Sequence, residues 1–100
     1  MEDKINALQY VNFVRQQKCC ICFNPPPNDP DHLDQIGMGR KRQDPSLLEH
    51  FSCIPLCRKH HSERHTMPIK QFEEIHNCNL WWEIYDCFTN YIIALRKGEL

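Results

Sequence analysis

Two pairs of metal-binding side chains, set far apart in the chain, constrain its fold more than any other feature. Cys19 and Cys22 are separated by two residues, and so are Cys57 and His60. Thiolates and imidazoles at this spacing can converge on one ion from a tight knuckle or from the start of a helix, and together they form a tetrahedral set that zinc prefers. We therefore predict a structural zinc that ties two distant segments together and contributes directly to folding.

A staple of this kind matters because the chain is short. Its 100 residues suit one domain, in which we expect a core at 18–66 and a C-terminal helical extension at 67–100. Hydrophobic residues make up 41% and charged residues 25%, as in ordinary globular proteins. No apolar stretch is long enough to span a bilayer, and Met1–Lys4 shows no apolar signal core. A cytoplasmic protein without a membrane partner is therefore expected.

The seven cysteines are many for a chain of this length. Their odd number argues against a closed disulfide framework, and their closeness to histidines favours metal binding in a reducing compartment. Four of them are predicted to be ordinary buried side chains: Cys20, Cys53, Cys78 and Cys87. Cys20 can also replace its neighbour Cys19 as a ligand if the knuckle has the other register.

The hydrophobic pattern predicts an α+β fold. Apolar residues at helical spacing indicate an N-terminal helix at 3–17 with Asp3 as its cap, and a final helix that begins after the capping residue Asn79. The prolines of 24–30 predict a rigid loop that is neither helix nor central strand. Between these segments we expect strands at 31–36 and 51–56, an exposed basic loop at 37–45, and helices at 57–65 and 69–76.

The helix from Cys57 to His65 is predicted to serve two metal sites. At about 100° per residue, His60 and His65 lie about 140° apart and cannot share an ion, whereas His61 and His65 lie one turn apart and can. Cys57 and His60 are therefore assigned to the zinc, and His61 and His65 to a second, catalytic site. Taken alone, His61 and His65 fit an exposed helix face equally well.

The second site needs a further ligand, which the dipeptide Asp31-His32 can supply after the rigid loop. Adjacent residues of a strand point to opposite faces, so both side chains cannot reach one ion without distortion. We assign Asp31 to the metal and leave His32 free as a base. A polar turn is the favoured alternative for this dipeptide alone, but not when it is taken together with the zinc pairs.

The net charge of −1 does not by itself indicate a nucleic-acid-binding protein, but the cations are unevenly distributed. A basic cluster within 40–59 is predicted to bind the phosphates of DNA, and its members are Arg40, Lys41, Arg42, Arg58 and Lys59. On charge alone, an ordinary mixed surface is favoured. No signal for base readout is present, so weak sequence specificity is expected.

The combined pattern resembles the HNH, or ββα-metal, endonuclease superfamily. The matching motifs, in chain order, are Cys19-x2-Cys22, Asp31-His32-Leu33, Ile54-Pro55-Leu56-Cys57 and His60-His61-x3-His65. They are most similar to those of small phage-borne HNH proteins associated with recombination and DNA processing. The resemblance implies a zinc-stapled ββα core at 18–66, preceded by an N-terminal helix and followed by a C-terminal helical pair, in a bacterial host or phage setting.

The resemblance also implies an activity, that of a DNA endonuclease or nickase that hydrolyses phosphodiester bonds. Beside the structural Zn²⁺, one catalytic divalent ion (Mg²⁺, Mn²⁺, Ni²⁺ or Zn²⁺) would be held by Asp31, His61 and His65. His32 would be the general base, and the ordinary pKa of histidine, about 6.5, suits that task.

The chain departs from the superfamily at the middle residue of the HNH motif, usually an Asn. Ser52 stands at this position, and the Asn often supports the loop around the base. Asp44, His50 or Ser52 can substitute for it.

Two other interpretations remain open. A catalytically silent zinc module that binds nucleic acid or a protein partner explains the zinc pairs and the basic loop, but not Asp31-His32 with His61 and His65. A homodimer, or a subunit of a larger phage nuclease or packaging complex, is the other. Trp81 and Trp82 are adjacent and cannot both be buried on one helix face, so one of them marks an interface or is a half-exposed core residue.

Overall fold

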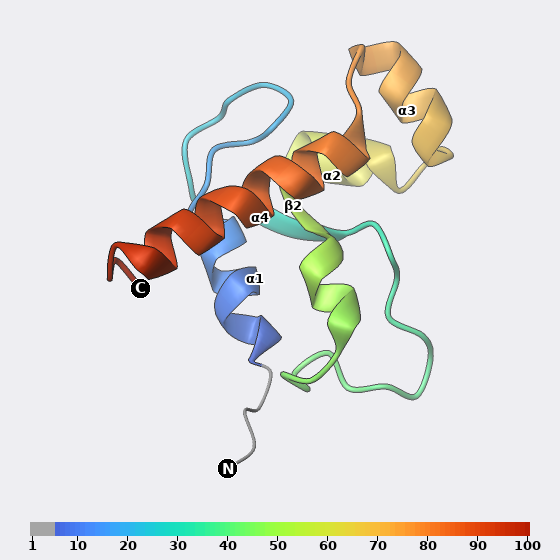
Figure 1. Cartoon of the computed structure of the whole chain (residues 1–100). Coiled ribbons are helices and arrows are strands. Elements are labelled where there is room, and N and C mark those ends of the chain that lie inside the picture. Colours follow the sequence, from blue (N-terminus) through green and yellow to red (C-terminus); the bar gives the residue numbers. More distant parts are fainter. Residues whose placement is uncertain (1–5) are drawn as a thin grey trace.

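The computed structural model describes residues 6–100, which form four α-helices, one 3₁₀ helix and one antiparallel sheet of two strands (Figure 1). This arrangement confirms the α+β class. The helix α4 lies across the sheet and α1, and α3 stands at the end of the molecule where α4 begins (Figure 1). The elements are α1 (Ala7–Arg15), β1 (Asp29–His32), η1 (Leu48–Ser52), β2 (Cys53–Leu56), α2 (Arg58–Arg64), α3 (Ile69–His76) and α4 (Leu80–Arg96).

The two strands are shorter than predicted, and β1 begins earlier. β1 covers Asp29–His32 in place of 31–36, so Asp29 and Pro30 belong to an edge strand and not, as predicted, to the rigid loop. Pro30 lies opposite Pro55 in the antiparallel pair. Neither residue has an N–H, so this pair must occupy a position without hydrogen bonds between the strands, which a sheet of two edge strands tolerates. Residues 48–52, partly expected as strand, form the 3₁₀ helix η1 instead.

The core lies on both sides of β2, whose four residues are all buried. One cluster joins α1, β2 and the second half of α4, and consists of Tyr10, Val11, Val14, Cys53, Cys87 and Tyr91. The other joins the knuckle, β2, α3 and the start of α4, and consists of Cys19, Leu33, Ile54, Leu56, Phe72 and Leu80. The C-terminal helices complete the core, because α4 contributes to both clusters and α3 to the second. Full burial of one Ile or Leu side chain contributes roughly 1.5–3 kcal/mol.

The predicted helices are present with small changes at their ends. α1 buries Tyr10, Val11 and Val14, and Asp3, its predicted cap, lies outside the described residues. α3 has the predicted bounds. The Asn79 side chain accepts a hydrogen bond from the Trp82 backbone N–H at 3.0 Å, as predicted for the cap of α4. Within 6–100, no helix is both long and apolar enough to cross a membrane.

Candidate metal centres

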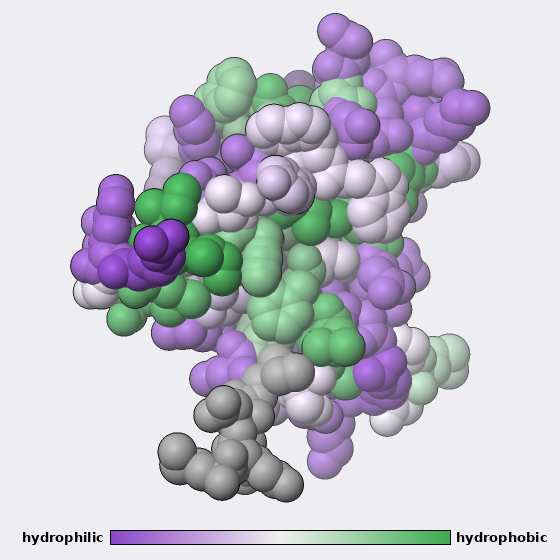
Figure 2. Space-filling view, viewed as in Figure 1, coloured by the Kyte–Doolittle hydropathy of each residue, from purple (hydrophilic) through white to green (hydrophobic). Residues whose placement is uncertain are grey.

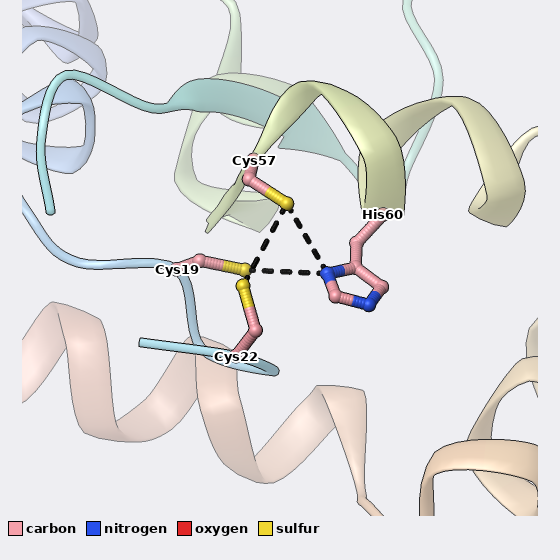
Figure 3. A group of neighbouring side chains, drawn as sticks. All are labelled: Cys19, Cys22, Cys57 and His60. Atoms are coloured by element: carbon pink, nitrogen blue, oxygen red, sulfur yellow. Dashed lines mark hydrogen bonds between the residues drawn. The ribbon is translucent and has the colours of Figure 1, made fainter. Parts of the chain in front are cut away.

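The four residues of the predicted zinc site converge on one point (Figure 3). Cys19 and Cys22 come from the knuckle after α1, and Cys57 and His60 from the start of α2 (Figure 3). The Cys57 thiol lies 3.2 Å from His60 Nδ1, and the Cys19 thiol 3.8 Å from the same nitrogen. The thiols of Cys22 and Cys57 are 3.8 Å apart.

The knuckle is held against β2 by backbone hydrogen bonds. The Phe23 N–H donates to the Cys19 carbonyl at 2.8 Å, which closes the turn, and Phe23 has a left-handed φ of 62°. The Cys20 N–H donates to the carbonyl of Pro55 at 3.0 Å. Because Cys57 follows Pro55 by two residues and stands at the N-terminus of α2, this bond brings the two half-sites together.

The geometry fits zinc. Zn–S bonds of about 2.3 Å and Zn–N bonds of about 2.0–2.1 Å in a tetrahedron place sulfurs about 3.8 Å apart and sulfur about 3.6 Å from nitrogen. The measured separations of 3.2–3.8 Å agree with these values. Cys19, Cys22, Cys57 and His60 could therefore hold a metal such as zinc.

The remaining cysteines lie outside this group. Cys53 and Cys87 are buried as predicted, whereas Cys20 and Cys78 are only partly buried. Cys20 packs against the core, and the converging thiol is that of Cys19. The register left open by the sequence is therefore the one with Cys19 as the candidate ligand.

A second group consists of Asp31 on β1 with His61 and His65 at α2, with ligand atoms within 4.8 Å of one another. Asp31 Oδ1 is 3.5 Å from His65 Nε2 and 3.9 Å from His61 Nε2. Two atoms that share an ion at about 2.1 Å lie roughly 3.0–3.4 Å apart. A small inward movement would thus bring the three side chains to bonding distance of a divalent ion. His60 belongs to the other group, as the helix geometry predicts.

Arg64 also binds the Asp31 carboxylate, which the sequence did not reveal. Its Nε and Nη2 each donate to one carboxylate oxygen at 2.5 Å, and both side chains are almost fully buried. A carboxylate offers about four lone-pair sites. Arg64 therefore neutralises the charge of Asp31 while leaving sites on the side of His61 and His65.

Asp29 holds the outer nitrogen of His61. His61 Nδ1 lies 3.0 Å from the Asp29 carboxylate, which itself pairs with Arg58 at 2.9 Å. A carboxylate on one ring nitrogen fixes the orientation of a histidine and leaves the other nitrogen for a metal. His61 thus presents Nε2 to Asp31.

His32 lies outside the second metal group, and its ring contacts the ring of His50. Its Nε2 lies 2.9 Å from Nδ1 of His50, and the other nitrogen of His50 lies 3.0 Å from the Asp44 carbonyl. Burial, with the Arg42 guanidinium nearby, lowers the pKa of His32 to about 4. The His32 ring is therefore neutral at pH 7, with a lone pair available to accept a proton.

Ser52 supports the neighbouring loop rather than the His32 ring. Its hydroxyl donates to the Glu49 carbonyl at 2.7 Å and accepts from the Asp34 N–H at 3.0 Å. Of the three substitutes considered for the missing Asn, the side chain that contacts His32 is that of His50.

A hollow of about 960 Å³ collects the second group and His32, and three arginines line it: Arg15, Arg42 and Arg58. Of the five cations predicted to bind DNA, Arg42 and Arg58 thus reach the hollow. Arg40 instead forms an ion pair with Glu49. Lys41 and Lys59 are exposed elsewhere.

Residues 2–89 match the model of a family described as a protein of unknown function, DUF968. The chain belongs to the DUF968 family. It is also similar to the uncharacterized protein YdfU of Escherichia coli K12, with 44% identity over 61 residues, which cover 58% of this chain and 16% of that protein. The chain thus spans about a sixth of the length of this curated relative. No solved structure matches the chain.

In this DUF968 chain, sequence reasoning missed Arg15, Asp29 and Arg64, and considered His50 only as one of three substitutes. The available signal was that each of the three missed residues is charged and stands at an end of α1, β1 or α2. Which of them pair with each other depends on contacts between segments about 30 residues apart, as for Asp29 with His61 or Asp31 with Arg64.

Proposed function

We propose that this chain is a metal-dependent DNA endonuclease or nickase domain of the HNH type. The observation that carries the proposal is the meeting of Asp31, His61 and His65 in one hollow with His32. Carboxylate and imidazole ligands beside a neutral histidine are what metal-assisted hydrolysis requires.

The order of elements supports the finer description of the fold. Two antiparallel strands are followed directly by α2, which carries residues of both groups. We propose that β1, β2 and α2 form a ββα-metal core, stapled by zinc at Cys19, Cys22, Cys57 and His60. α1 precedes this core, and α3 and α4 cover it.

His32 would act as the general base, taking a proton from the attacking water. A divalent ion held by Asp31, His61 and His65 would supply positive charge that stabilises the phosphate oxygens as the bond breaks. Asp29 would keep His61 oriented for this task. The products would carry 5′-phosphate and 3′-hydroxyl ends.

Arg42, Arg58 and Arg15 would hold the phosphates on either side of the scissile bond, because all three line the hollow. Backbone contacts of this kind do not read the bases, so sequence specificity would be weak. Free thiolates at the zinc site suit a reducing compartment, such as the cytoplasm of a bacterial host.

The rival function is a silent zinc module that binds nucleic acid or a protein partner. It is favoured by one observation, namely that Arg64 already binds both oxygens of Asp31.

Trp81 and Trp82 are both more than half exposed, and apolar and weakly polar side chains gather along α4 on the face drawn in Figure 2. A homodimer or a larger phage nuclease complex could use this face.

The deciding experiment is cleavage of plasmid and branched DNA by the zinc-loaded protein, with Mg²⁺, Mn²⁺, Ni²⁺ or Zn²⁺ added in turn. We expect nicked or linear products that disappear in EDTA and in the His32→Ala variant. DNA binding without cleavage by any ion would favour the silent module.

A further inference from the structure

We propose that His50 is a positioning residue that fixes the tautomer of His32, so that His32 accepts the proton of the attacking water at Nδ1. This inference rests on the proposed nuclease function and adds a residue to it. The carrying observation is a chain of two hydrogen bonds, from His32 through His50 to the backbone at Asp44.

The direction of this chain follows from the Asp44 carbonyl, which can only accept a hydrogen bond. His50 Nε2, 3.0 Å away, must therefore carry the hydrogen. In a neutral imidazole the other nitrogen is then an acceptor. His50 Nδ1 thus accepts from His32 Nε2 at 2.9 Å, and Nδ1 is the nitrogen of His32 that remains without a hydrogen.

His50 is buried without a carboxylate partner among the described residues. The residue is 1% exposed, and in residues 6–100 no carboxylate forms an ion pair with its ring. Burying a charged ring without a charged partner is costly. The tilted contact between the two rings, with centroids 5.2 Å apart, also limits rotation of the His32 ring.

The plainer interpretation is that His50 is a buried histidine that only fills space and satisfies a carbonyl. That role needs only one ring nitrogen. Here the second nitrogen is used as well, and its partner is His32, which lines the hollow of the second metal group. The helix η1 is therefore connected to the proposed base, His32, through the side chain of His50.

Three substitutions separate positioning from packing. His50→Asn keeps an acceptor on Cγ, where Nδ1 is attached, and so preserves the bond to His32. His50→Gln moves the amide one carbon further, towards the Asp44 carbonyl, and His50→Phe fills the space with neither bond. We expect His50→Phe and His50→Gln to lower kcat for DNA cleavage at least about tenfold with KM unchanged, as part of what a general base supplies. His50→Asn should recover most of this decrease, and an equal decrease in all three variants would overturn the proposal.

A measurement that does not depend on cleavage is ¹⁵N NMR of the imidazole rings in the zinc-loaded wild-type protein. We expect both His32 and His50 to carry hydrogen on Nε2, and the His32 signal to become a mixture of tautomers in His50→Phe. Hydrogen on Nδ1 of His32 in the wild type would overturn the proposal even if the protein cleaves DNA. If the tautomers are as expected but no ion supports cleavage, the nuclease function and the proton transfer to His32 Nδ1 are both refuted. The assignment of His50 as the residue that fixes the His32 tautomer would then still hold.

Discussion

The guanidinium of Arg64 and the carboxylate of Asp31 form a two-bond ion pair, both bonds 2.5 Å long, that joins α2 to β1 inside the protein. Both residues are at most 5% exposed. Asp31 also belongs to the second metal group, so the strand and the helix that supply this group are fixed to each other by charge as well as by packing.

Breaking this pair should destabilise the protein strongly. Arg64→Met leaves a buried carboxylate without its partner, which costs about 3–5 kcal/mol in comparable cases. Urea unfolding followed by circular dichroism measures the change, with the exposed Arg96→Met as the matched control. A destabilisation below about 1 kcal/mol would show that the pair is solvated in solution.

The zinc prediction concerns Cys57. Cys57→Ser should lose the bound zinc and much of the folded population, because the metal contributes folding free energy. Metal analysis and circular dichroism report both effects. Cys20→Ser, at the neighbouring position of the knuckle, should keep its zinc. A folded Cys57→Ser protein with one zinc per chain would refute the assignment.

Base and ligand variants should respond differently to added metal. His32→Ala should cleave DNA about 10²–10⁴-fold more slowly, and excess Mn²⁺ should not restore the rate. His65→Ala should weaken the affinity for the catalytic ion, so excess Mn²⁺ should restore part of the rate. His65 serves better than Asp31 here, because removing Asp31 would also strand Arg64. Equal cleavage by His32→Ala and wild type would require another base.

DNA binding should depend on Arg42 more than on Arg40. Arg42 lines the hollow, whereas Arg40 is paired with Glu49. In the zinc-loaded protein without any added divalent ion, Arg42→Ala should reduce the slope of log affinity against log salt by about 0.9, because one phosphate is no longer neutralised. Arg40→Ala should leave the slope almost unchanged, and the reverse order would place the DNA beside Arg40 and Glu49 rather than in the hollow.

The stability of the protein should depend on pH through Glu83. Burial, with Asp86 nearby, raises the pKa of Glu83 above its ordinary value of 4.5. The folded state therefore binds this proton more tightly than the unfolded state, and stability is lost as pH rises through the raised pKa. Glu83→Gln should become more stable relative to wild type as the pH rises from about 4 to about 7 in urea titrations. A difference that stays constant with pH would contradict this.

Spacing along the chain was sufficient to predict the zinc group and the division of α2 between two groups. Both depend on local geometry, since residues three or four apart on a helix have fixed relative directions. The capping of α4 by Asn79 was predictable for the same reason.

The strand bounds and the partners of the site residues were not predictable in this way. The opposed prolines Pro30 and Pro55 are acceptable only in a two-stranded sheet, whose size the sequence does not reveal. The partners of Asp31 and His32 are set by how α2 and η1 pack on the strands. His50 in particular could be placed next to His32 only once η1 was known to precede β2.

One seven-residue helix, α2, has consequences for how the protein would respond to metal supply. His60 and His61 are consecutive on it and belong to different groups, so an ion that orders the helix for one group orders it for the other. Binding of the two ions would then be cooperative, and by thermodynamic reciprocity each would raise the affinity for the other by the same factor. Under the proposed function, removal of zinc would therefore also lower the affinity of the second group for its divalent ion, and cleavage would fall although that ion is still present.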